Sequence, residues 1–254
     1  MNSFLITKIL SQMKMRTLFA FFVLSTLVAM PAFAQKGLEV GVRIIPQSVW
    51  IINDDDSARG DGLDFTRTWG MAYGVQAGYN FLDFLGIQTG LLYSGQGQKY
   101  VGDGSAGFET LQVKLNYLKI PLLLKVNSNP DAGAHFVATF GVQYEVLTGA
   151  KYVVDDVDFD VNPQTLNYIK LGSQFNIEEA YANNLAAVFS LGARFRVSDS
   201  FNLGLSFRGD YSLTDIENKS LTQGSNSVFS ADRPTTANLT GGIMIEANYI
   251  LGSR

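Results

Sequence analysis

Hydrophobic and polar residues alternate along two adjoining segments near position 200. From Leu185 to Val197 every odd position is apolar, and the even positions are mostly small or charged, ending in Arg194 and Arg196. After a short polar stretch at 198–200 the alternation resumes and runs to position 213. A period of two residues is that of a β-strand. The two segments therefore predict a β-hairpin with one apolar face.

The same alternation recurs at 69–81, 136–146 and 243–251. We expect an all-β fold with about eight antiparallel strands. They are placed at 38–52, 67–81, 85–100, 108–127, 134–150, 184–198, 200–215 and 235–252.

The connections between these strands differ in length. Those at 81–85, 127–133 and 198–200 are short, whereas 53–66, 101–107, 151–183 and 216–234 are mostly longer and polar. Bacterial membrane barrels have short periplasmic turns and longer outer loops. The rhythm predicts that both chain ends lie on the periplasmic side.

The composition of the two faces distinguishes a membrane barrel from a soluble one. The face opposite the apolar residues is mostly Gly, Ala, Ser, Asn and Gln, which suits the crowded interior of a narrow barrel. A soluble β-sandwich or barrel is the alternative, with the large apolar residues inside. Aromatic residues also fall at strand ends, as membrane interfaces favour. Expected at the outer rim are Trp50, Trp69, Tyr93 and Tyr144 or Tyr211, and at the inner rim Tyr79, Phe81, Phe84, Phe201 and Tyr249.

The N-terminal segment has the pattern of a cleavable signal peptide. Lys14 and Arg16 precede an apolar run at 18–30, and the sequence Ala-Phe-Ala ends at Ala34. A transmembrane anchor is the alternative, but spanning a bilayer takes about 20 apolar residues. We expect cleavage between Ala34 and Gln35. The chain then divides into a signal peptide, 1–34, and a barrel domain, 35–254, with Met1, Met13 or Met15 as the translation start.

Charge and cysteine content exclude several functions. The formal net charge is −4, and removing the three basic residues of the first 34 positions leaves −7. An acidic chain is a poor ligand for nucleic acid. The chain has no cysteine, which excludes disulfides, thiol catalysis and thiolate metal sites.

Catalysis and metal binding have weak support in the sequence. The single histidine, His135, is expected at the inner end of a strand, where an outer-membrane hydrolase would not place its catalytic pair. Two acidic clusters could hold Ca²⁺, but solvated loops are favoured. The second cluster resembles the start of an EF-hand loop, in which Val161 and Asn167 replace the required Gly and Glu. These clusters are Asp54, Asp55, Asp56, Asp61 and Asp64, and Asp155, Asp156, Asp158 and Asp160. A short helix starting with Asn176 as N-cap is expected in the longest loop. We expect no enzyme activity, no cofactor and no catalytic or metal-binding residues.

Charged residues are also expected inside the barrel. Because buried charges need partners, we predict ion pairs that fill the lumen, with a narrow ion path as the alternative. The residues of inward parity are Glu145, Arg194, Arg196, Arg208, Asp210 and Glu246.

The segment at 116–125, NYLKIPLLLK, is the most distinctive motif. It resembles the NYLEIPLLLK motif of the PorT-like outer-membrane β-barrel proteins of Bacteroidetes. The resemblance implies a small antiparallel barrel of the OmpA/OmpX type, and for one member a role in type IX secretion. Lys119 stands where the family often has an acidic residue, so any role of that carboxylate is not carried over.

The same segment predicts an irregularity. Apolar residues have odd numbers up to Tyr117 and even numbers from Leu118 to Leu124. This change of parity, with Pro121 close by, predicts a β-bulge at Tyr117–Leu118.

The expected function is a structural or interaction role through the outer loops, and the resemblance adds an accessory role in protein secretion to this expectation. Its partners would be outer-membrane lipid and envelope or secretion-system proteins, in the cell outer membrane. A small channel is the alternative, and an outer-membrane hydrolase is a weaker one. Loop 151–183 is the first candidate for a partner surface.

Overall fold

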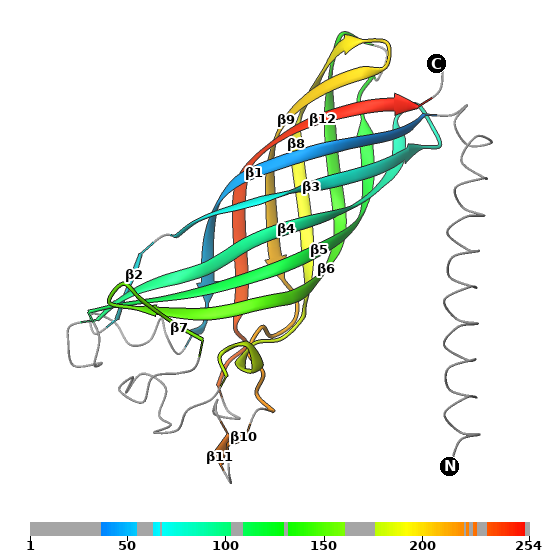
Figure 1. Ribbon diagram of the computed structural model, residues 1–254. Helices are drawn as coiled ribbons and strands as arrows, with labels where there is room; N and C mark the ends of the chain where they lie inside the picture. The colour runs from blue at the N-terminus through cyan, green and yellow to red at the C-terminus, as the bar shows by residue number, and fades with distance from the viewer. Residues whose placement is uncertain are drawn as a thin grey trace, which may run out of the picture.

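Eight long antiparallel strands close into a barrel in the computed structural model (Figure 1). The structure describes residues 37–54, 63–66, 68–102, 109–129, 132–160, 176–220, 222–223, 226–227 and 233–251. The predicted signal peptide lies outside these residues.

The eight barrel strands match the predicted segments closely. They are β1 (Leu38–Ile52), β3 (Thr68–Asn80), β4 (Leu85–Gly102), β5 (Thr110–Asn127), β6 (Ala134–Val154), β8 (Asn184–Ser198), β9 (Phe201–Ser212) and β12 (Ala237–Leu251). Around the wall the order is β4-β3-β1-β12-β9-β8-β6-β5, and the pairing of β4 with β5 closes it. The all-β, eight-stranded antiparallel barrel predicted from the alternation is confirmed.

Within the ranges that the structure describes, five short elements lie outside the barrel wall proper. They are β2 (Leu63–Thr66), β7 (Val157–Phe159), the 3₁₀ turn η3 (Glu178–Ala180), β10 (Thr222–Gln223) and β11 (Asn226–Ser227). β2 pairs with β4, β7 with β6, and β10 with β11.

The two ends of the barrel differ as the loop lengths predicted. Short turns join β3 to β4, β5 to β6 and β8 to β9 at one end, where Leu38 and Leu251 also pair. The other four connections are at the opposite end (Figure 1). We call the end with the longer connections the outer end, because these face outward in bacterial barrels.

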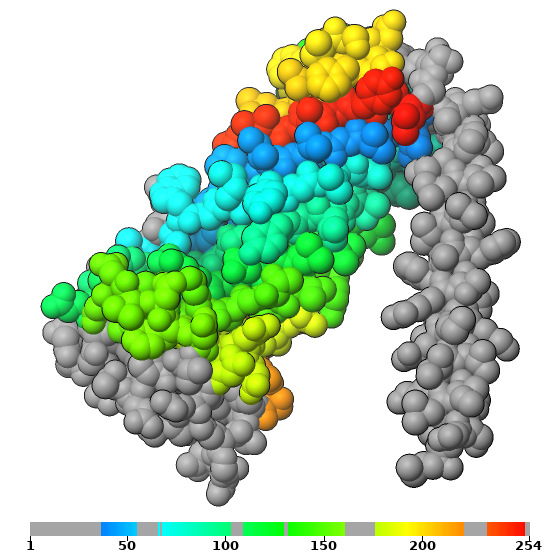
Figure 2. All heavy atoms as spheres, in the orientation of Figure 1, coloured from blue at the N-terminus to red at the C-terminus, as the bar shows by residue number. Residues whose placement is uncertain are grey.

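Apolar side chains face outward from the barrel wall. On β8 and β9, Phe189, Leu191 and Phe207 are exposed, whereas Ser190 and Arg208, each next to one of them along the strand, are buried. The space-filling view shows one side of this wall (Figure 2). Among the described residues, no helix is long and apolar enough to cross a membrane.

Three neighbouring strands are longer than the others. β4 and β5 have 18 residues each and β6 has 21, whereas the remaining five have 12 to 15. About 9–11 residues of a tilted strand cross the hydrocarbon core. These three strands therefore continue beyond it at the outer end, where β2 and β7 widen the sheet (Figure 1). We call residues 95–102, 110–117 and 147–159 the outer extension.

The predicted bulge is present, but it lies on β6 and not on β5. The β5–β6 register changes from Asn116↔Gly149 to Tyr117↔Leu147, which leaves Thr148 as the extra residue. β5 itself alternates without interruption, since Tyr117 and Lys119 are both buried. The apolar residues change parity because the strand leaves the lipid. Within the membrane the outer face of β5 is apolar. In the outer extension the inner face of β5 is apolar instead.

Candidate functional site: the filled lumen and the outer extension

A first group of charged side chains fills the inner half of the lumen. The Glu39 carboxylate accepts hydrogen bonds from Arg194 Nη1 at 2.9 and 3.0 Å, and Lys125 Nζ lies 2.7 Å from Glu39 Oε1. Arg194 Nε also donates to Glu246 Oε1 at 2.6 Å. Arg43 Nη2 is 3.9 Å from Glu246 Oε2. All five side chains are buried.

A second group lies closer to the outer end. Lys119 Nζ is 2.9 Å from Asp210 Oδ2 and 3.2 Å from Glu145 Oε1. Arg208 Nε donates to Asp210 Oδ1 at 2.9 Å, and its Nη2 donates to Gln143 Oε1 at 2.6 Å. The carboxylates are thus paired on more than one side, as buried charges require.

Many of these contacts cross the lumen. Lys119 on β5 reaches Asp210 on β9, and Glu39 on β1 binds residues of β5 and β8. In each case the two strands that the contact joins are not adjacent in the wall. Gln76 on β3 donates to Glu246 on β12 at 3.1 Å. The side chains therefore bridge opposite walls and occupy the interior.

Glycines opposite the charged residues make this filling possible. A Cβ added to Gly204 would lie 2.5 Å from Glu246 Cγ, and one added to Gly78 would lie 2.8 Å from Glu39 Oε1. Both distances are shorter than atoms in contact tolerate. The small residues of inward parity thus provide the space that the ion pairs occupy.

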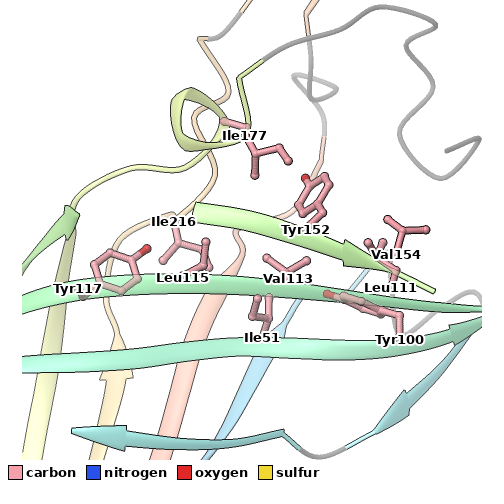
Figure 3. Packing of buried hydrophobic residues seen from close by; sticks show 11 residues of the cluster. Ile51, Tyr100, Leu111, Val113, Leu115, Tyr117, Tyr152, Val154, Ile177 and Ile216 are labelled. Atoms are coloured by element: carbon pink, nitrogen blue, oxygen red, sulfur yellow. The ribbon is translucent and has the colours of Figure 1, made fainter. Parts of the chain in front are cut away.

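An apolar cluster stands at the outer end of the lumen, inside the outer extension (Figure 3). It joins the inner faces of β4, β5 and β6 to the outer loops. Tyr117, Leu115 and Ile216 are fully buried in it. Its members are Ile51, Tyr100, Leu111, Val113, Leu115, Tyr117, Tyr152, Val154, Ile177, Ala180 and Ile216.

Two loop segments cover this cluster. Ile177 and Ala180 come from the segment around η3, and Ile216 from the segment after β9. An isolated bridge between Tyr181 and Glu217 joins the two segments. Glu217 is also held by Arg233, whose Nε donates to Glu217 Oε2 at 2.8 Å. We call residues 176–182 and 213–219 the cover.

The cover includes the short helix predicted at Asn176, which is a single 3₁₀ turn. Asn176 Oδ1 accepts a hydrogen bond from the Glu178 backbone N–H at 3.1 Å. The N-cap of the turn is Ile177, however, which has no side-chain capping bond, so the predicted N-cap at Asn176 was wrong by one residue. A cleft of about 660 Å³ opens beside this turn. Its lining is Leu147, Asn176, Glu178, Glu179, Tyr181, Ala182, Asn183 and Asn218.

Comparison with known proteins agrees with this architecture. Residues 33–218 match the model of a family described as outer membrane protein beta-barrel domain. The chain belongs to this family. No curated protein matches it in sequence.

Several solved outer-membrane barrels resemble the chain. OprG of Pseudomonas aeruginosa is 14% identical with a TM-score of 0.47, over 85% of this chain and 95% of that one. Outer membrane protein W of E. coli is 14% identical with a TM-score of 0.37, over 85% and 98%. The Neisserial surface protein A is 9% identical with a TM-score of 0.44, over 84% and 96%.

Five of the six charged residues predicted for the interior of this outer-membrane barrel lie in it. These are Glu145, Arg194, Arg208, Asp210 and Glu246. The sixth, Arg196, is half-buried at the inner end of β8, where the β8–β9 register shifts.

Four charged lumenal residues were not predicted. They are Glu39, Arg43, Lys119 and Lys125. The first two alternate with apolar residues along β1, so the period-two pattern contained their signal. Lys119 and Lys125 have the parity opposite to that of the apolar residues at 118–124, so the sequence contained their signal as well.

His135 lies at the inner end of β6, facing the lumen opposite Arg194 on β8. This is the position expected from the sequence. It is far along the strand from the outer extension, so it is not part of the surface formed there.

The second acidic cluster does not form one site. Asp155 and Asp156 have positive φ angles of 47° and 66° and make the tight turn between β6 and β7. Asp155 Oδ1 accepts the backbone N–H of Thr110 at 2.8 Å, and Asp158 pairs with Lys151. Across the described residues, no three His, Asp or Glu side chains are close enough to hold a metal ion. Asp55, Asp56 and Asp61 of the first cluster lie outside those residues.

Proposed function

We propose that this outer-membrane barrel is a non-conducting interaction protein that acts through the outer extension and its cover. The observation that carries the proposal is the contrast between the two halves of the molecule. The lumen is occupied by ion pairs that cross it, while three strands continue beyond the membrane with an apolar core of their own. Such a core holds a rigid surface in front of the membrane.

The filled lumen argues against the channel alternative. An eight-stranded barrel has an interior just wide enough for side chains. Here Lys119, Lys125 and Arg194 are at most 2% exposed, and each binds a carboxylate on a strand that is not its neighbour. An ion would have to displace paired charges at two levels, and the apolar cluster stands at the outer end.

The partner surface that we propose is formed by the cover and the adjoining cleft. Glu178 and Glu179 are exposed on η3, and Asn183 and Asn218 line the cleft beside them. Amide and carboxylate groups on a supported loop suit recognition of another envelope protein. This includes part of loop 151–183, the segment for which a partner was first expected.

The finer assignment rests on the motif at 116–125. Its resemblance to the PorT-like proteins of Bacteroidetes supports an accessory role in protein secretion across the envelope. Residues 1–34 would then direct export and be removed after Ala34. We assign no catalysis, since His135 faces the lumen at the inner end.

Two measurements test the proposal. Planar-bilayer recording of the purified chain should give no single-channel steps, and a conducting lumen would contradict a non-conducting role. In cells, deletion of the gene should change the set of secreted or surface-exposed proteins, and wild-type protein should restore it. A barrel-intact variant with a disrupted cover, Ile216→Asn, should fail to restore it. Full restoration by this variant would show that the cover is not the acting surface.

A further inference from the structure

Three lysines meet on the outward face of the outer extension. Lys114 on β5 is directly opposite Lys151 on β6. On the other side, Lys114 pairs with Gly97 of β4, two residues from Lys99. We call Lys99, Lys114 and Lys151 the lysine patch.

The parity of the strands sets the direction of the patch. Leu111, Val113 and Leu115, the neighbours of Lys114 along β5, are buried in the apolar cluster on the inner face. Lys114 therefore points away from the barrel axis. This is the side on which the lipid-facing residues lie farther down the strand, among them Ile120 and Leu122.

The patch is also close to the membrane. Lys114 is four residues from Leu118, where the outward face of β5 becomes apolar. At about 3.4 Å per residue and a tilt of about 40°, four residues rise about 10 Å. Lys114, with Lys151 opposite it, thus stands at the level of lipid headgroups and the sugars attached to them, and Lys99, opposite Gln112, is two residues farther out.

Placing these charges together has a cost. Like charges directly opposite each other on antiparallel strands destabilise the pair. Asp158 on β7 offsets part of this repulsion. The hydrogen bond that Lys151 donates to Asp158 is the main cause that lowers the pKa of Asp158, and the charge of Lys114 lowers this pKa further. Among the described residues, neither Lys99 nor Lys114 has an ion pair.

Several acidic residues of the outer extension lie at its tip. Its tip carries Glu109, Asp155 and Asp156, next to the β6–β7 turn. The lysine patch is nearer the membrane, where Asp158 and Asp160 offset part of the charge of Lys151. An anionic surface at headgroup level would attract the base of the outer extension and repel its tip, so this arrangement also favours one orientation.

We propose that the lysine patch binds the anionic headgroups of phosphorylated glycolipid in the outer leaflet. The outward direction, the height above the apolar band and the unpaired lysines together fit phosphate groups held in the plane of the membrane. Their binding relieves the repulsion between Lys114 and Lys151 and holds the outer extension in a fixed position over the leaflet. The binding is independent of whether the lumen conducts or the cover binds a protein.

The test uses the full mature chain in lipid nanodiscs. One set contains zwitterionic phospholipid only, and the other also contains a diphosphorylated glycolipid. Native mass spectrometry after mild delipidation measures how much glycolipid stays bound. A lysine near an anionic surface strengthens binding roughly fivefold. The double variant Lys99→Gln/Lys114→Gln should therefore weaken retention roughly 25-fold.

The matched control is Lys99→Arg/Lys114→Arg, which keeps both charges and should retain glycolipid as the wild type does. Heat-modifiable migration on gels verifies that each variant is a folded barrel. Equal retention by the Gln and wild-type proteins would overturn the proposal. So would displacement of glycolipid by inorganic phosphate at similar concentration, because the ligand would then be a soluble anion and not a lipid surface.

Discussion

Tyr117 and Lys119, two residues apart on β5, point to the same side of the strand and are both buried. Tyr117 packs in the apolar cluster of the outer extension, whereas Lys119 binds Asp210 and Glu145 in the lumen. The interior of the molecule therefore changes from polar to apolar between these two residues. Because the outer face changes in the opposite sense, this step marks the outer boundary of the membrane.

A charge scan along the outward face of β5 tests this boundary. Leu122 lies in the middle of the lipid-facing stretch and is 61% exposed. Leu122→Arg should lower the free energy of unfolding by about 2–4 kcal/mol, the cost of an arginine at the bilayer midplane. Asn116→Arg, beyond the boundary, should change it by less than about 0.5 kcal/mol. Urea unfolding in phospholipid vesicles measures both, and equal costs would place the boundary elsewhere.

Removing one charge from the second lumenal group, which lies closer to the outer end, should cost more stability than removing two opposite charges together. Lys119→Met leaves Glu145 and Asp210 facing each other without their shared cation. We expect a loss of about 3–5 kcal/mol, because an uncompensated buried charge remains. Lys119→Met/Glu145→Gln removes one charge of each sign, and Asp210 keeps its bond to Arg208. This double variant should recover more than half of the loss in the same unfolding assay. A double variant as unstable as the single one would argue against a charge-balance explanation.

Glycines that pair with charged residues on the adjacent strand leave no space for a larger side chain, so replacing them should destabilise the barrel. Gly204→Val should destabilise the barrel by about 1–3 kcal/mol, since its Cβ would lie 2.5 Å from Glu246 Cγ, and Glu246 is held by Arg194. Gly133 is the matched control, because nothing lies within 4 Å of a Cβ added there. Gly133→Val should be nearly neutral by gel-shift thermal midpoint. Similar effects at both positions would indicate that backbone propensity, and not lumenal packing, is responsible.

The sequence was sufficient for the barrel because its wall obeys one repeated rule. Period-two alternation placed β1 and β8 at their observed bounds, and it placed Arg194 and Glu246 in the lumen. The rule fails where the environment reverses. A parity change at Tyr117 has the same sequence pattern whether a bulge turns the strand or the solvent around it changes. Only the arrangement of β4, β5 and β6 in space distinguishes the two.

The cover of the outer extension could not be predicted from the sequence, for a related reason. Ile177 and Ile216 are isolated apolar residues in polar loops, so no periodicity marks them. Their partners, such as Leu115 and Tyr152, lie far away in the sequence. The short helix at Asn176 was predicted from a local capping signal alone.

Disrupting the cover should loosen the outer extension and leave the membrane barrel intact. Ile216 is fully buried among residues of the apolar cluster, and its backbone N–H donates to Thr236 O at 3.0 Å. Ile216→Asn places an amide in this apolar environment, at a cost of about 1–3 kcal/mol. Because the lumenal ion pairs do not involve this residue, heat-modifiable migration should be unchanged.

Hydrogen exchange in Ile216→Asn should instead accelerate at 111–117 and 150–154, and remain slow at 186–195, where β8 lies between β6 and β9. Ile216→Val, which keeps the apolar contact, should exchange like the wild type. Uniformly faster exchange in Ile216→Asn would mean that the outer extension and the barrel unfold as one unit, whereas exchange confined to the outer extension would establish it as a separately stabilised surface.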